Sequence, residues 1–195
     1  MKLTKVGAIA ASAVFVFAAC SPAPGASAPA ASGSGAAGAQ PEVCKNKKGT
    51  STSEIHVYSS LPLQGASRPQ TTAMVEGIRL ALQQNNGKAG DLTVKYTSLD
   101  DSTASEGSWT PEATQANARK VAQDDTAAVY IGEFNSGASA VSIPVLNEAG
   151  VPQISPANTA VGLTSDEPGA DAGEPDKYYP TGQRTYMRIV PKDTI

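Results

Sequence analysis

The residues best placed to do chemistry in this sequence form the segment 132–137, which reads GEFNSG. It follows a predicted strand and opens a predicted helix, so Ser136 and the first amides of that helix would point out of the fold. Amides at a helix N-terminus, aided by the helix dipole, suit a carboxylate or a phosphate. Ser136 could instead be only the N-cap of the helix. The segment is no Walker loop, because no lysine follows at the required position.

A second candidate segment, 154–159 (ISPANT), follows the next predicted strand. In a parallel sheet the carboxyl ends of neighbouring strands share one edge, and ligands bind there. The hydroxyls of Ser155 and Thr159 and the backbone of Ala157 would then meet the same ligand as Ser136. The alternative is a loop of small polar residues that only satisfies its own turn.

Catalytic and metal chemistry are weakly supported. His56 is the only histidine and lies inside a predicted strand, whereas a Ser-His-Asp arrangement would have to use it. No cluster of His and Cys offers a metal site, and we expect no cofactor. Asp100 and Asp101 are adjacent and should face opposite ways, which favours a turn or cap role over paired acid/base chemistry. Trp109 could be a lid, but packing is the favoured role.

Strand and helix patterns alternate along residues 51–195, which we predict to be one ligand-binding lobe. Their order indicates an α/β fold, a doubly wound and mainly parallel sheet with helices on both faces. Segment 103–109 reads as irregular and 162–182 as a long loop. Strands are predicted at 54–61, 92–99, 126–131, 151–155 and 184–190, and helices at 72–84, 111–123 and 136–149. The strand at 126–131 shows no alternation, which suits a strand buried on both faces.

The N-terminus is typical of an export signal. Lys2 and Lys5 precede an uncharged apolar stretch that ends in Ala19 and Cys20. A membrane span needs about 20 apolar residues, and this stretch is shorter. We therefore predict a lipoprotein signal peptide at 1–19 and lipidation of Cys20. The alternative of an uncleaved membrane helix is disfavoured by this length. An ordinary signal peptide cut near Ala19 stays open, because Phe17 stands where bacterial lipoproteins usually carry Leu.

Residues 20–50 are predicted to be a solvated tether, since they are rich in Ser, Pro, Ala and Gly. Cys44 is then left without an assignable disulfide partner. The chain carries 15 basic and 18 acidic residues, a formal net charge of −3, and shows no basic stripe. Nucleic-acid binding is therefore not expected.

The motifs together resemble the leucine/isoleucine/valine-binding group of periplasmic substrate-binding proteins of ABC importers. The resemblance spans residues 55–193 and implies the first lobe of a type I periplasmic-binding fold. We expect the chain to continue into a second lobe. The matching motifs are LQG at 63–65, EGIRLA at 76–81, DD at 100–101, Gly132 with SG at 136–137, GVPQISPA at 150–157 and RIVPKD at 188–193.

The resemblance implies a binding protein and not an enzyme. By their positions in the family pattern, the resemblance implies that Ser136 binds the ligand carboxylate, that Ala157 offers backbone groups and that Thr159 offers its hydroxyl. Gln70 falls near the first loop that approaches the ligand, while Asn158 stands where the family usually has a small residue. The implied partners are an amino-acid-like small molecule, ABC permease subunits and the membrane, through the N-terminal lipid on the outer face of the cell membrane.

Two other functions stay open at this point. The same fold could serve a ligand sensor that signals to a membrane partner. An exported serine hydrolase would need a histidine and an acid placed beside an exposed serine. The ligand itself is expected to be an amino acid or a similar small carboxylate or amide, with urea and aromatic acids among the possibilities.

Overall fold

The computed structural model describes residues 47–50 and 52–193. The predicted signal peptide, Cys20, Cys44 and most of the tether lie outside these residues. The strands are β1 (Glu54–Leu61), β2 (Lys88–Ala89), β3 (Leu92–Asp100), β4 (Ser102–Thr103), β5 (Ser108–Trp109), β6 (Ala127–Ile131), β7 (Gln153–Ser155) and β8 (Tyr186–Arg188). The α-helices are α1 (Arg68–Gln84), α2 (Pro111–Gln123) and α3 (Ser136–Glu148), and three 3-10 turns cover Gly65–Ser67, Val161–Leu163 and Asp176–Tyr178.

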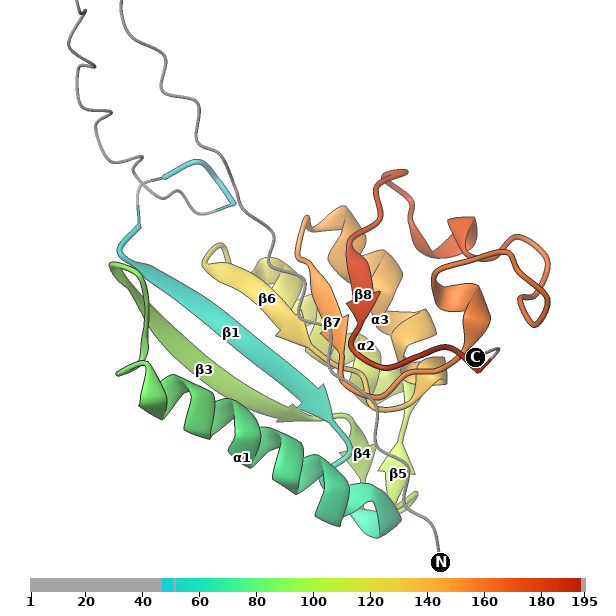
Figure 1. The fold of residues 1–195 in the computed structure, drawn as a ribbon, viewed down its shortest axis with the longest axis horizontal. Helices are drawn as coiled ribbons and strands as arrows, with labels where there is room; N and C mark the ends of the chain where they lie inside the picture. The colour runs from blue at the N-terminus through green and yellow to red at the C-terminus, as the bar shows by residue number, and fades with distance from the viewer. Residues whose placement is uncertain (1–46, 51, 194–195) are drawn as a thin grey trace, which may run out of the picture. The chain divides into compact units, whose positions relative to one another are not determined.

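Six strands form one sheet in the order β2-β3-β1-β6-β7-β8. Every neighbouring pair is parallel except β2 with β3. Figure 1 shows α1 along β1 and β3 on one face, and α2 and α3 on the other face. The predicted doubly wound α/β fold is therefore confirmed. Within the described part of the chain, no helix is both long and apolar enough to cross a bilayer.

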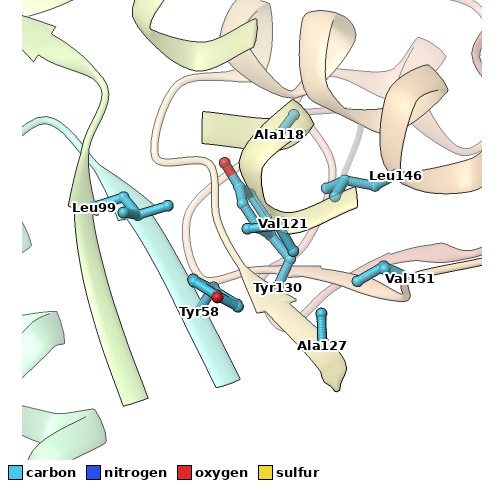
Figure 2. Packing of buried hydrophobic residues seen from close by; sticks show 8 residues of the cluster. All are labelled: Tyr58, Leu99, Ala118, Val121, Ala127, Tyr130, Leu146 and Val151. Atoms are coloured by element: carbon cyan, nitrogen blue, oxygen red, sulfur yellow. The ribbon is translucent and has the colours of Figure 1, made fainter. Parts of the chain in front are cut away.

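The main hydrophobic core lies between the sheet and the helix pair α2 and α3 (Figure 2). Tyr130 of β6 stands at its centre and has no exposed surface. Close packing of such side chains supplies most of the favourable free energy of folding. The buried members of this core are Tyr58, Leu99, Ala118, Val121, Ala127, Tyr130, Leu146 and Val151.

Local signals explain why several elements begin where they do. The Thr110 hydroxyl accepts a hydrogen bond of 3.2 Å from the Ala113 amide, and Pro111 occupies the first turn of α2. Such a cap and an N-terminal proline both favour a helix start. The same effect of Pro69 lets α1 begin at Arg68, four residues before the predicted start at Thr72.

Two expectations from the sequence were wrong in detail. The segment predicted to be irregular is a hairpin, in which Ser102 pairs with Trp109 as β4 and β5. The strand predicted to be buried on both faces, β6, buries Ala127 and Tyr130 but leaves Val129 and Ile131 only partly covered. The reason is that α1 covers the sheet along β1 and β3 and leaves this face of β6 more open (Figure 1).

Candidate functional site

The first turn of α3 presents amides without partners in the helix. Asn135 is the N-cap residue and its side chain makes no capping hydrogen bond. The amides of Ala138 and Ser139 donate to the Asn135 carbonyl oxygen at 3.1 and 3.2 Å. By helix geometry the two preceding amides, of Ser136 and Gly137, have no acceptor in the helix. Ser136 is therefore the first helical residue and not the cap, which removes the interpretation that it serves only as a cap.

The loop after β7 is attached to this turn, so the structure brings Ser136, Ser155 and Ala157 together. The Ala160 amide donates to Ser136 Oγ at 3.3 Å. Ser155 Oγ accepts from the Ala157 amide at 3.2 Å and donates to the Glu133 carbonyl oxygen at 2.8 Å. Ser155 is fully buried, so its hydroxyl is engaged inside the protein and holds the two loops against each other.

Asn158 joins these loops to α3 and β8, a role that the sequence analysis missed. Its side-chain amide donates to the carbonyl oxygens of Glu133 and Phe134 at 3.1 and 2.9 Å. Its Oδ1 accepts from Ser139 Oγ at 2.5 Å and from the Tyr186 hydroxyl at 2.9 Å. The residue is almost completely buried. The only signal in the sequence was its departure from the small residue usual at this position.

The remaining predicted residues lie nearer to solvent. Thr159 is exposed, and its carbonyl oxygen accepts from the Asp193 amide at 3.0 Å. Gln70 is exposed in the first turn of α1. No side-chain hydrogen bond among the described residues joins Gln70 to the other predicted site residues.

Two buried carboxyl groups meet beneath the loop that carries Ser136. Glu133 and Asp101 have no exposed surface, and Tyr130 donates its hydroxyl proton to Glu133 Oε1 at 2.6 Å. Burial, then the charge of Asp101, raises the pKa of Glu133 well above its usual value. Burial likewise raises the pKa of Asp101 to about 6. Burial and the charge of the neighbouring carboxyl group both favour the protonated form. Neither Asp101 carboxyl oxygen nor Glu133 Oε2 has a hydrogen-bond partner among the described residues.

Asp100 has the turn role that the sequence favoured, whereas Asp101 does not. Asp100 Oδ1 accepts from the amides of Leu63 and Ser102 at 2.9 and 2.8 Å, and Oδ2 accepts from Gln64 Nε2 at 2.9 Å. Burial acts to raise the pKa of Asp100, but these hydrogen bonds outweigh it and hold the pKa below its usual value. Asp100 thus ties the loop after β1 to the end of β3.

A cavity of about 220 Å³ lies beside the first turn of α3. Ser136 and Gly137 line one side, and Glu174 and Tyr178 of the long loop line another. A Cβ atom at Gly162 would stand 1.5 Å from Glu174 Oε2, so the Glu174 side chain lies directly against the Gly162 backbone. The loop predicted after β7 therefore folds against α3 and adds an acidic rim next to Ser136.

A family model described as "Periplasmic binding protein" matches residues 54–189. The chain belongs to this family. A comparison with curated protein sequences finds no significant match. The predicted relationship to substrate-binding proteins of the branched-chain amino-acid type is supported by solved structures of the same fold.

Three of the solved structures that resemble this periplasmic binding protein show the degree of similarity and the ligands that these proteins hold. LivJ from Streptococcus pneumoniae, in complex with isoleucine, has a TM-score of 0.56 at 20% identity and is matched over 72% of this chain and 35% of its own. A substrate-binding protein from Desulfitobacterium hafniense, in complex with Leu, has a TM-score of 0.52 at 23% identity over 72% and 35%. A solute-binding protein from Rhodopseudomonas palustris BisB5, with 3,4-dihydroxy benzoic acid, has a TM-score of 0.56 at 17% identity over 72% and 33%.

These matches establish the fold and its extent. The chain spans about a third of the length of the solved structures that it matches. They are type I periplasmic-binding proteins, and the described residues of this periplasmic binding protein correspond to part of that fold, one lobe.

Proposed function

We propose that this protein is an extracytoplasmic receptor that binds an amino acid or a similar small carboxylate or amide for an ABC importer. The observation that carries the proposal is the uncapped first turn of α3 at the carboxyl edge of the sheet. Free amides and the positive end of the helix dipole favour a carboxylate at this place. Isoleucine, leucine and dihydroxybenzoic acid, the ligands named for the similar structures, all carry a carboxylate.

The proposed contacts differ in how directly they touch the ligand. Ser136 offers its hydroxyl and amide to the carboxylate, Ala157 offers backbone groups, and the exposed Thr159 offers its hydroxyl. Gln70 would approach from the first turn of α1. The buried hydroxyl of Ser155 is engaged by Glu133 and Ala157, so we assign it the role of positioning the loop.

The rest of the proposal concerns the complete protein. A second lobe would close over the ligand and create the surface that permease subunits recognise. Cys20 would carry the lipid that anchors the protein to the outer face of the membrane. A sensor of the same fold that signals to a membrane partner is the second candidate, because ligand capture at α3 would serve it equally well.

The first experiment is a thermal-shift screen of the full-length protein against amino acids, amides and small carboxylates. A ligand that binds only the folded state raises the midpoint of unfolding. Ser136→Ala should then weaken binding of the selected compound about 10-fold or more, because it loses a hydrogen bond to a charged group. Ser53→Ala, at an exposed position before β1, is the matched control and should bind like the wild type. A folded protein that shifts with no compound would contradict the receptor function.

A separate experiment tests the anchor. Cys20→Ser should move the protein from the membrane fraction to the soluble fraction and abolish incorporation of radiolabelled palmitate. Cys44→Ser is the matched control and should leave both unchanged. Membrane retention of the Cys20→Ser variant would contradict lipidation at this residue, without any bearing on ligand binding.

A further inference from the structure

The indole of Trp109 packs directly on the first turn of α3. A Cβ atom at Gly137 would lie 2.8 Å from Trp109 Cζ2 and 3.1 Å from Cη2. Real Cβ atoms do not approach other atoms so closely, so the ring occupies space that only a glycine leaves free. Gly137 follows Ser136, and both contribute free amides to the proposed carboxylate site. The ring therefore stands next to that site.

The hairpin that carries Trp109 is held at both of its ends. Its first strand is tied to the loop after β1, since the Gln64 amide donates to Ser102 Oγ at 3.1 Å. Its open end is closed directly after β3, since the Thr110 amide donates to the Asp101 carbonyl oxygen at 2.8 Å. Trp109 therefore stands on a hairpin that hydrogen bonds hold in place, and not on an unattached loop.

The tip of the hairpin rests on the 3-10 turn that follows β1. A Cβ atom at Gly65 would stand only 1.8 Å from the Gly107 carbonyl oxygen, so the two backbones are in contact. The hairpin therefore reaches from the loop after β1 to the start of α3. These are the elements that follow β1 and β6, the neighbouring strands whose chains leave toward opposite faces of the sheet. Ligands of such sheets bind in the crevice at this point.

We propose that Trp109 forms one wall of the ligand site and selects carboxylates that carry an aromatic or similarly broad apolar group close to the carboxylate. This inference rests on the proposed function. Trp109 is only partly buried, so part of the indole remains free for a ligand. An indole presents a wide, flat apolar surface and prefers stacked or edge-on contacts with other rings. Because the ring lies against Gly137, the group that contacts it must be attached near the carboxylate.

The test is a comparison of affinities for matched carboxylates, measured by calorimetry on the full-length protein. The pairs are benzoate with acetate, and phenylalanine with alanine. Wild type should prefer the aromatic member of each pair. Trp109→Ala should weaken the aromatic member about 10-fold and leave the small member within about 2-fold, in line with the strength of aromatic contacts. Trp109→Phe should restore part of the preference.

The preference ratio separates a ligand contact from simple packing. A packing role would change the midpoint of unfolding, or both affinities equally, and would leave the ratio unchanged. That result would overturn the inference while the proposed function stands. Binding of no carboxylate by the folded wild type would instead overturn the proposed function and the inference with it. Ser105→Ala, at the exposed hairpin tip, controls for general disturbance of the hairpin and should keep the wild-type ratio.

An independent readout comes from fluorescence, since Trp109 is the only tryptophan in the sequence. Benzoate at saturation should protect its emission from quenching by acrylamide, whereas acetate should protect it less. Equal protection by both anions would contradict contact between the aromatic group and the indole.

Discussion

At each end of β6 a tyrosine hydroxyl donates to a carboxyl group, but the pKa values of the two carboxyl groups are shifted in opposite directions. Near the amino end, the Tyr58 hydroxyl donates to Asp124 Oδ2 at 2.7 Å, and beyond the carboxyl end the Tyr130 hydroxyl donates to Glu133 Oε1 at 2.6 Å. The pKa of Asp124 is lowered to about 2, whereas the pKa of Glu133 is raised well above its usual value. A tyrosine donor alone therefore does not decide whether a carboxyl group ionises.

Other donors and some solvent keep Asp124 ionised. Burial acts to raise its pKa, but Thr126 donates from its hydroxyl at 2.7 Å and its amide at 2.8 Å, and His56 Nδ1 lies 2.9 Å away. The Asp124 side chain also retains 22% of its exposure. Glu133 has no exposed surface, and besides burial the charge of another carboxyl group, Asp101, raises its pKa. Burial and a neighbouring carboxyl group therefore favour the protonated form of Glu133, whereas hydrogen bonds and solvent favour the ionised form of Asp124.

The cluster near the amino end of β6 consists of His56, Tyr58, Thr97 and Asp124, and we call it the amino-edge cluster. Within it a hydroxyl, an imidazole and a carboxylate are hydrogen-bonded in a row. His56 Nε2 lies 2.8 Å from Thr97 Oγ1, while Nδ1 faces Asp124. This order resembles a hydrolase triad in its connectivity. Thr97 lies inside β3 and pairs with Tyr58 of β1, so it has no helix N-terminus beside it to stabilise an oxyanion. The row links β1, β3 and the start of β6 and is best understood as structural.

Glu133→Ala should give the largest effect on this comparison. It would leave the Tyr130 hydroxyl without an acceptor inside the protein. We expect a loss of about 3 kcal/mol in the free energy of unfolding, measured by urea denaturation at pH 7. A loss below about 1 kcal/mol is what an exposed site would give, and it would contradict a stabilising role of Glu133 at this end of β6.

Asp124→Asn should have the next largest effect, and the effect should depend on pH. Because the pKa of Asp124 is lowered in the folded state, its ionised form stabilises the protein above about pH 4, and this contribution is lost as pH falls toward 2. We expect a loss of about 2 kcal/mol at pH 7 and a smaller loss at pH 3, from unfolding curves of both proteins. An equal loss at both pH values would contradict the assigned ionisation.

Glu133→Gln should change the free energy of unfolding in the opposite direction and stabilise the protein at high pH. The raised pKa values of Glu133 and Asp101 mean that the folded state binds more protons than the unfolded state, so wild-type stability should fall as pH rises from about 4 through about 6 and beyond. Glutamine stays neutral and can still accept from Tyr130. We expect this variant to exceed wild type by about 1 kcal/mol at pH 8 and to show a flatter pH dependence. Parallel stability curves from pH 4 to pH 8 would contradict the raised pKa of Glu133.

Thr97→Val should have the smallest effect. It removes one partly buried hydroxyl and should reduce the free energy of unfolding by about 1 kcal/mol or less. Affinity for the carboxylate identified in the thermal-shift screen should stay at the wild-type value, because the cluster lies at the edge away from α3. Loss of a hydrolytic activity in this variant would break the comparison, since it would make the amino edge the functional one.

Elements specified by nearby residues could be predicted well. The bounds of β1 and α2 match the predicted 54–61 and 111–123 because β-branched residues, a Thr cap and a following proline act within a few positions. The order of strands and helices then led to the parallel sheet and to the edge at which we propose that the ligand binds. The family resemblance was confirmed on the same segments, and the placement of the ligand at Ser136, Ala157 and Thr159 stays a prediction.

The sequence by itself determined the three helices, the main parallel strands and their order. Only the tertiary structure brought Trp109 against Gly137, Asp101 against Glu133, and Asn158 beneath the loop at Glu133 and Phe134. Each of these pairs is separated by more than twenty positions, so no cap, period or turn signal links its members. The contact forms only when parallel strands align their carboxyl ends, and burial there then decides which polar groups stay free for a ligand and which hold the loops.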